Sequence, residues 1–406
     1  MSLTFLPSLQ HLAAVRVALA AYNDDTVRLL DELILKEKAT ARYKLIPNED
    51  DDDRIEMIQI EEDNSEDCFY KQQEKWIRKS KKKARKKLSK LLPKLLQKRV
   101  VHILQPLATE IYFWVRDHWY IIKHIERGHF TNNLCWKSEG TIDRTKTAKQ
   151  LVRNESIGKR VRFAMACIYF WENDVLHLWH SMTTAERKSI FSINSNVAVH
   201  FWMKWLRKRA RPPWTQLVSN YMDSDVLKLD YNRVRLSSFF IELNTFSQGV
   251  FLRGLWPQHA HIDDLRLCYN LLDETGRSEI FHSQSKTSQV LCCYLDWPLQ
   301  SLFLDAVNQV RSHLTAFSFE YLLYKIVHKK LMRGMQDFDY LQLLKDLWNR
   351  IPDPYKVEIQ RQRDFTLVRA AMCYDEETHP LPIQKLLKKC SEFTNELVFE
   401  KIRSLL

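Results

Sequence analysis

Apolar residues recur at helical spacing near the start of the chain. Drawn as a helix, residues 8–21 place one set of them on a single face. The members of this set are Leu9, Leu12, Ala13, Val17 and Ala20. The polar stretch 22–25 predicts a turn, and the same period resumes in residues 27–34. Residues 1–47 are therefore predicted to form an N-terminal helical hairpin.

Apolar and aromatic residues are dense from residue 100 onwards and follow the same helical period. Two stretches look alike, since each has an apolar run with one Arg, an acidic turn and then a similar motif. The first comprises Val161–Cys167 and residues 186–191, and the second comprises Leu265–Cys268 and residues 276–281. A single helix pair cannot bury its apolar face alone, so neighbouring pairs must stack. The predicted fold is all-α, with antiparallel helix hairpins stacked as an irregular superhelix or a compact multi-helix array over residues 100–406.

This layout resembles divergent ankyrin-like proteins or other α-helical repeat proteins. The resemblance implies a non-enzymatic scaffold or adaptor that binds another protein through its stacked helices. The Thr-Pro-Leu-His stretch of ankyrin repeats is missing. The alternative is that any antiparallel helical protein produces similar segments, because core helices draw on few residue types.

Glycine and cysteine usage narrow the possible folds and compartments. The chain has only 7 glycines, and Rossmann folds, P-loops and β-sandwiches all need more for their tight turns. The 8 cysteines form no Cys-x-x-Cys pair, which favours free thiols in a reducing compartment. The N-terminus does not resemble a signal peptide, and no apolar run is long enough to span a bilayer. An intracellular location, in the nucleus or the cytoplasm, is expected.

Charge is concentrated in two adjacent segments. Residues 48–67 contain eleven acidic residues, so the region 48–70 is predicted to be a flexible acidic linker. Residues 71–99 contain fourteen Lys or Arg and one Glu, and are predicted to be partly helical. The net charge of the whole chain is +12, so the basic segment by itself accounts for the whole excess of positive charge.

The densest part of the basic segment matches a nuclear-import cluster that an importin-type receptor would read. Its residues are Lys79, Lys81, Lys82, Lys83, Arg85, Lys86 and Lys87. The same cations could bind the phosphates of nucleic acid, an anionic lipid surface or a calmodulin-like partner. The alternative is a solvated linker that pairs with its own acidic neighbour.

Leucines continue beyond this cluster at helical spacing, at positions 88, 91, 92, 95 and 96. Pro93 predicts that one helix breaks at Leu92 and that the next helix begins with Pro93 near its first turn. Such a stripe is typical of core contact.

A second basic patch interleaves with tryptophans between residues 202 and 211. Its cations are Lys204, Arg207, Lys208, Arg209 and Arg211. Together with residues 75–99, this patch supports the hypothesis of a nucleic-acid-associated protein, because bases stack on aromatic rings beside cations. Large aromatics at helical spacing are more often core residues.

The N-terminal helix also resembles the elongin-binding helix of a SOCS box. Leu9, Ala13 and Val17 recur every four residues, as anchors that dock a helix into a groove do. The resemblance implies a ubiquitin-ligase substrate adaptor that binds elongin B and C. The alternative is a packed N-terminal helix.

Catalytic motifs are scarce. His259 and His261, followed by Asp263 and Asp264, have ligand types suited to Zn or Fe, but no third ligand follows at a diagnostic spacing. Walker A, Gly-x-Ser-x-Gly, HExxH and kinase signatures are missing from the sequence. We therefore expect no enzyme activity, no metal and no cofactor.

Overall fold

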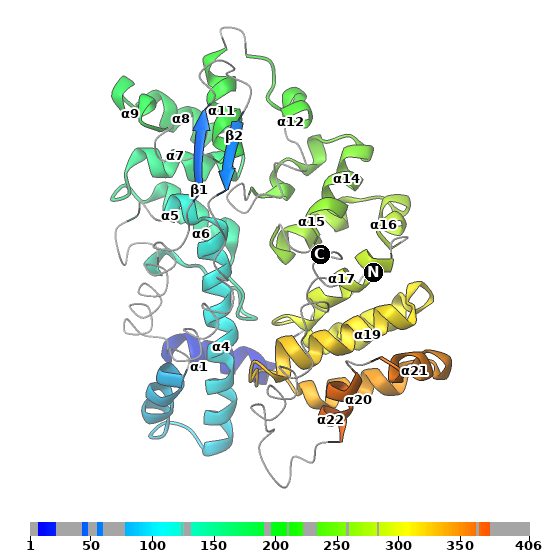
Figure 1. Ribbon diagram of the computed structural model, residues 1–406. Helices are drawn as coiled ribbons and strands as arrows, with labels where there is room; N and C mark the ends of the chain where they lie inside the picture. The colour runs from blue at the N-terminus through cyan, green and yellow to red at the C-terminus, as the bar shows by residue number, and fades with distance from the viewer. Residues whose placement is uncertain are drawn as a thin grey trace. The chain divides into compact units, whose positions relative to one another are not determined.

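The computed structural model describes residues 7–21, 43–47, 55–59, 78–122, 125, 131–190, 196–208, 211–221, 234–256, 260–281, 284–362 and 365–373. These residues are predominantly helical (Figure 1), which confirms the predicted all-α class. The chain packs as two compact units, with the boundary between Leu243 and Asn244. Residues from both units belong to the segment 100–406 that is predicted as the helical-repeat body.

The first unit extends from Pro7 to Leu243. Residues 78–88 are helical but carry no label in Figure 1. The labelled α-helices are α1 (Leu9–Ala21), α4 (Lys94–Asp117), α5 (Trp119–Ile122), α6 (Arg144–Arg153), α7 (Lys159–Ile168), α8 (Glu172–Ser181), α9 (Thr184–Lys188), α11 (Val197–Arg207) and α12 (Thr215–Tyr221). Short 3₁₀ turns are η1 (Thr131–Asn133), η3 (Leu236–Ser238) and η4 (Phe240–Glu242).

The second unit begins at Asn244. Its α-helices are α14 (Thr245–Leu255), α15 (Ile262–Leu271), α16 (Glu274–Phe281), α17 (Gln284–Cys292), α18 (Phe303–Gln309), α19 (Ala316–Lys325), α20 (Tyr340–Arg350), α21 (Asp353–Gln360) and α22 (Phe365–Met372). The 3₁₀ turns are η5 (Cys293–Leu295), η6 (Gln300–Leu302) and η7 (Arg311–His313), and η8 (Ile326–Leu331) is a π-helix that continues α19. Helix α19 packs against α17, η8 and α21.

A two-stranded antiparallel hairpin is an exception to the helical pattern. Strand β1 (Tyr43–Pro47) pairs with β2 (Ile55–Gln59), with Leu45 opposite Met57. The first strand falls in the region predicted to be a helical hairpin, and the second falls in the predicted acidic linker. The prediction missed both strands. For β2, the acidic composition hid the alternation of Ile55, Glu56 and Met57. The second helix of the predicted hairpin lies outside the described residues.

Large aromatic side chains fill the core of the first unit, as predicted. Trp114, Trp202 and Phe163 are completely buried. Phe170 ends helix α7 with a positive φ of 52°, a backbone conformation that usually requires glycine. Its ring lies 4.8 Å from the ring of Phe239, and this packing offsets the backbone cost. A helix can therefore end sharply here without a glycine.

The two look-alike stretches share one local arrangement. In α9, the Arg187 Nε atom donates to the carbonyl of Trp179 at 3.0 Å and the guanidinium lies over that ring. In α16, the Arg277 Nε atom donates to the carbonyl of Tyr269 at 3.3 Å, again with the guanidinium over the ring. By these contacts α15 corresponds to α8, whereas the sequence pattern alone pairs it with α7. Membership of a repeat family stays a prediction.

Candidate functional site

The most distinctive surface is a helix–turn–helix that we call the basic hairpin, residues 78–99. It comprises the helix of residues 78–88, a turn, and the first part of α4, and it contains twelve Lys or Arg and no Asp or Glu. Ser80, Ala84 and Leu88, spaced four residues apart, are buried. Because they form a single narrow stripe, the remaining faces of the helix point to solvent. Eleven of the twelve cations are exposed.

Hydrogen bonds join this helix to its neighbours. Lys81 Nζ donates to Gln105 Oε1 in α4 at 3.2 Å, and Lys87 Nζ donates to the carbonyl of Ala20 in α1 at 3.4 Å. Lys81 is half-buried, so this predicted site residue has a structural role. The helix lies beside the N-terminal end of α4, which α1 also contacts (Figure 1).

Four of the other predicted cations remain available to a ligand. Lys79, Lys82, Arg85 and Lys86 are exposed and form no ion pair with any other residue that the structure describes. The site also includes cations outside the predicted cluster. These are Lys90, Lys94, Lys98 and Arg99, all exposed.

The turn of the hairpin exposes leucines. Helix α4 begins after Pro93, as the proline predicted, but the preceding helix ends at residue 88 and not at the predicted Leu92. Leu91 is 70% exposed and Leu95 is 78% exposed; we call this pair the leucine tip. The prediction that the stripe contacts the core is correct for Leu88 and wrong for the tip, because helix packing ends before the turn.

The second basic patch lies at the end of α11. Lys204, Arg207 and Lys208 are exposed, and the Arg211 guanidinium lies 5.5 Å from the centre of the Trp205 ring. Cations at a helix C-terminus are favoured by the helix dipole. Arg209 lies outside the described residues.

Helix α1 buries a different face from the one predicted. Ala14, Val15 and Ala18 are buried, and the helix packs against α4. Leu9 is 85% exposed, Ala13 is exposed and Val17 is half-buried. Both faces contain two alanines, so side-chain size does not distinguish them, and the contact with α4 determines which one is buried. The elongin-binding hypothesis stays a prediction, and its anchor residues lie largely on the outer face.

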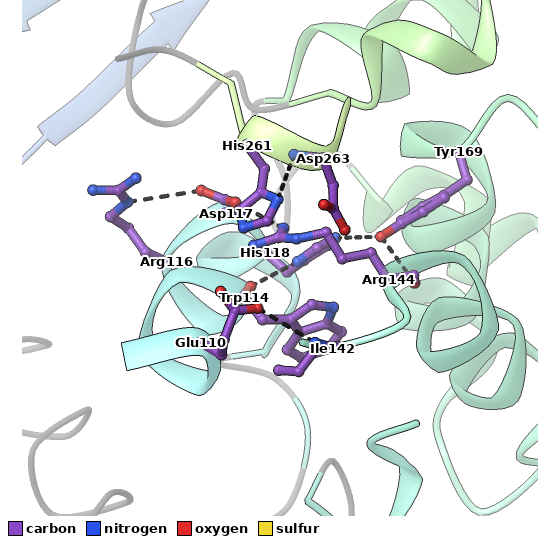
Figure 2. Close-up of polar contacts among 10 residues, drawn as sticks. All are labelled: Glu110, Trp114, Arg116, Asp117, His118, Ile142, Arg144, Tyr169, His261 and Asp263. Carbon is purple, nitrogen blue, oxygen red and sulfur yellow. Dashed lines mark hydrogen bonds and ion pairs between the residues drawn. The ribbon is translucent and has the colours of Figure 1, made fainter. Parts of the chain in front are cut away.

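A buried polar network lies within the first unit (Figure 2). Arg144 and Asp117 form a buried ion pair at 2.8 Å. The ring of His118 contacts the carbonyl of Trp114 through Nδ1 at 2.7 Å and the hydroxyl of Tyr169 through Nε2 at 3.0 Å. Because a carbonyl only accepts, Nδ1 carries a hydrogen. The Tyr169 hydroxyl, which has a single hydrogen, contacts both Nε2 and the carbonyl of Arg144, to which it donates at 3.2 Å.

The protonation state of His118 follows from this environment. Burial and the neighbouring Arg144 cation lower the pKa of His118 from 6.5 to about 4. The imidazole is therefore neutral near neutral pH. Its partners lie on α4, α6 and α7, and neither ring nitrogen is left for a substrate. The network thus joins elements of the fold and offers no exposed acid or base.

A second polar network lies in the other unit. Lys330, on the π-helix η8, pairs with Asp296 at 2.7 Å. Burial by itself lowers the pKa of Lys330, but the Asp296 carboxylate outweighs this effect and raises it above its ordinary value. Gln300 donates to Asp337 at 2.7 Å, and burial raises the pKa of that carboxyl. π-Helical turns often occur at functional sites, but no ligand chemistry follows from these contacts.

Thiol and metal chemistry have little support among the described residues. Burial raises the pKa of Cys292 to about 12, which makes a reactive thiolate unfavourable. No group of three His, Cys, Asp or Glu residues in the described ranges is placed to hold a metal ion. His259 lies outside them, and His261 accepts the amide hydrogen of Asp263 at 3.2 Å as the N-cap of α15.

Comparison with protein-family models, curated proteins and solved structures gave no match for this chain. Its function is therefore inferred from the basic hairpin itself.

Proposed function

We propose that this protein attaches to an anionic phospholipid surface through the basic hairpin. The observation that carries the proposal is the leucine tip, which two helical segments present among eleven exposed cations. Lys and Arg attract acidic headgroups, while exposed leucines enter the boundary between headgroups and acyl chains. This is peripheral attachment. In the described part of the chain, no helix is both long enough and apolar enough to cross a bilayer.

The energies of the two contributions are comparable. Each cation near an anionic surface contributes about 1 kcal/mol, so four or five cations contribute as much as a single lipid anchor. Burying a leucine side chain contributes about 1.5–3 kcal/mol. Cations alone bind weakly at physiological salt, and leucines alone would not select anionic lipid. Both features are therefore needed for selective attachment.

Nucleic acid is the second candidate, and it is favoured by the same twelve cations. Phosphate contacts explain the cations but give no role to Leu91 and Leu95, which stay in water on a phosphate backbone. An importin-type receptor is a third candidate. The buried stripe of Ser80, Ala84 and Leu88 holds the segment in a helix, so an extended-chain reader would have to unfold it. The hypotheses of a scaffold and of an elongin-binding adaptor remain predictions.

A leucine substitution distinguishes lipid from nucleic acid. We expect Leu91→Ser with Leu95→Ser to weaken binding of the full chain to vesicles of phosphatidylcholine and phosphatidylserine by about a hundredfold, from the burial energy of two leucines. Flotation of the protein with the vesicles measures the partitioning. Retention on duplex DNA should not change. The matched control is Leu271→Ser in α15, where the leucine is also exposed.

A lysine substitution tests the cations. Lys90→Ala with Lys94→Ala should lower vesicle partitioning by roughly tenfold or more, since each charge contributes about 1 kcal/mol. The matched control is Lys188→Ala with Lys208→Ala, two exposed lysines outside the hairpin. If the leucine variant binds anionic vesicles normally while the lysine variant loses both vesicles and DNA, nucleic acid becomes the better assignment. Equal binding to pure phosphatidylcholine would contradict the proposal.

A further inference from the structure

Two serines lie in the basic hairpin, and the fold treats them differently. Ser80 is 5% exposed, and its hydroxyl is buried on the stripe that packs the helix. Ser89 is exposed in the turn. Its hydroxyl donates only to the carbonyl of Lys86, at 2.9 Å, one helical turn earlier. Only Ser89 is therefore accessible to an enzyme in the folded chain.

The residues before Ser89 form a charge pattern of the kind by which basophilic kinases select substrates. Arg85, Lys86 and Lys87 lie four, three and two positions before the serine, and Lys90 follows it. Acidic side chains in a kinase cleft read such cations. Ser89 also lies where the helix of residues 78–88 gives way to a turn, and terminal helical turns open at low free-energy cost.

We propose that Ser89 is a phosphorylation site for a basophilic serine kinase, and that its phosphorylation releases the basic hairpin from anionic membranes. The second part rests on the proposed function. In the reaction, the Ser89 Oγ atom attacks the γ-phosphorus of ATP. The new O–P bond forms as the bond to the β–γ bridging oxygen breaks, ADP leaves, and the hydroxyl proton passes to the base of the kinase.

The added charge acts at the place where attachment occurs. A phosphoserine carries about −1.5 to −2 charges at neutral pH. It would lie two residues before Leu91 and next to Lys90, so it both repels acidic headgroups and disfavours immersion of the leucine tip. It also lies at the C-terminal end of a helix, where the dipole disfavours negative charge. Neutralising about two positive charges of the hairpin in this way predicts roughly thirtyfold weaker binding to the vesicles.

The first experiment tests the site. The full chain is incubated with a basophilic serine kinase and Mg-ATP, and modified positions are mapped by mass spectrometry in wild type, Ser89→Ala and Ser80→Ala. Wild type and Ser80→Ala should gain one phosphate in the hairpin, at Ser89, and Ser89→Ala should gain none there. A synthetic peptide of residues 76–92, in which neither serine is buried, should also be modified mainly at Ser89, because Trp76 and Ile77 precede Ser80 at the positions where Arg85 and Lys86 precede Ser89. Modification of Ser80 as readily as Ser89 in the folded chain would overturn the site, as would an unmodified Ser89.

The second experiment tests the consequence. Phosphorylated and unmodified chains are compared for partitioning onto vesicles that contain phosphatidylserine. A loss of about thirtyfold is expected for wild type, and kinase treatment should change nothing in Ser89→Ala. Equal partitioning of the two forms would overturn the release step. If the unmodified chain does not bind these vesicles at all, the proposed function and the release fail, while the mapped phosphate at Ser89 still stands.

Discussion

His118 illustrates how a single residue in this protein is set by its surroundings. Its ring is stacked on Trp114 at 4.5 Å and bonded at both nitrogens. Protonation would place a second cation beside the buried Arg144. The folded state therefore favours the neutral ring, so the stability of the fold depends on pH.

The sign of this effect follows from the two pKa values. The pKa of His118 is about 4 in the folded chain and 6.5 in the reference state, so the unfolded chain binds more protons between these values. Lowering the pH through this window therefore destabilises the fold, on the order of 3 kcal/mol in full. The stabilisation is present above the upper value and is lost by the lower one.

We expect His118→Gln, which stays neutral at all pH values, to remove this dependence. The measurement is the free energy of unfolding in urea at several pH values across the window. Wild type should lose about 3 kcal/mol more than the variant does. Parallel curves for the two proteins would show that the ring is not held neutral by the fold.

At the scale of elements, sequence patterns predicted the helices better than their orientations. The break at Pro93 follows directly from proline chemistry, and the burial of Trp114 and Trp202 follows from helical spacing. The buried face of α1 did not follow, because the sequence does not show on which side α4 packs. The end of α7 at Phe170 was equally hidden, since a positive φ normally signals glycine.

The leucine tip shows most clearly what a pattern cannot reveal. Leu88 and Leu95 belong to one periodic stripe in the sequence, yet one is 2% exposed and the other 78%. Periodicity identifies which residues share a face. Whether another element covers that face depends on where the neighbouring helices end. The cations of the candidate site were therefore predictable, and the role of the leucines was not.

Leu88 anchors the helix of residues 78–88, and its truncation should loosen that helix. We expect Leu88→Ala to cost about 2–4 kcal/mol locally, the usual loss for a buried leucine. Amide hydrogen exchange over residues 78–88 should speed up. The matched control is Leu91→Ala, which removes an exposed side chain from the same turn. An exchange pattern identical to wild type in Leu88→Ala would mean that the stripe does not hold the helix.

At the scale of the whole molecule, each unit has its own core. Trp114, Trp202 and Phe163 are completely buried in the first, and Phe303 and Phe319 are almost completely buried in the second. Each unit is of the size that folds as an independent domain. The basic hairpin belongs entirely to the first unit. Vesicle binding and the unfolding of each unit can therefore be measured on separate fragments of the chain.

We expect the fragments 7–243 and 244–406 to unfold cooperatively on their own. Thermal unfolding followed by near-ultraviolet circular dichroism measures this, because buried aromatic rings give the signal. Fragment 7–243 should bind vesicles that contain phosphatidylserine, and fragment 244–406 should bind them far more weakly. A fragment without a cooperative transition would contradict the division into two units.

Pro93 determines the shape of the basic hairpin as well as the start of α4. Without the ring at this position, residues 78–117 could continue as one rod about 60 Å long, at 1.5 Å per residue. Leu91 and Leu95 would then lie along the side of this rod and not at the end of a hairpin. By interrupting the helix, the ring of Pro93 produces a hairpin in place of a straight rod. The leucine tip is then already formed in the folded chain before it contacts any surface. Most of the conformational entropy of forming that tip is thus lost during folding, and contact with a surface need not supply it.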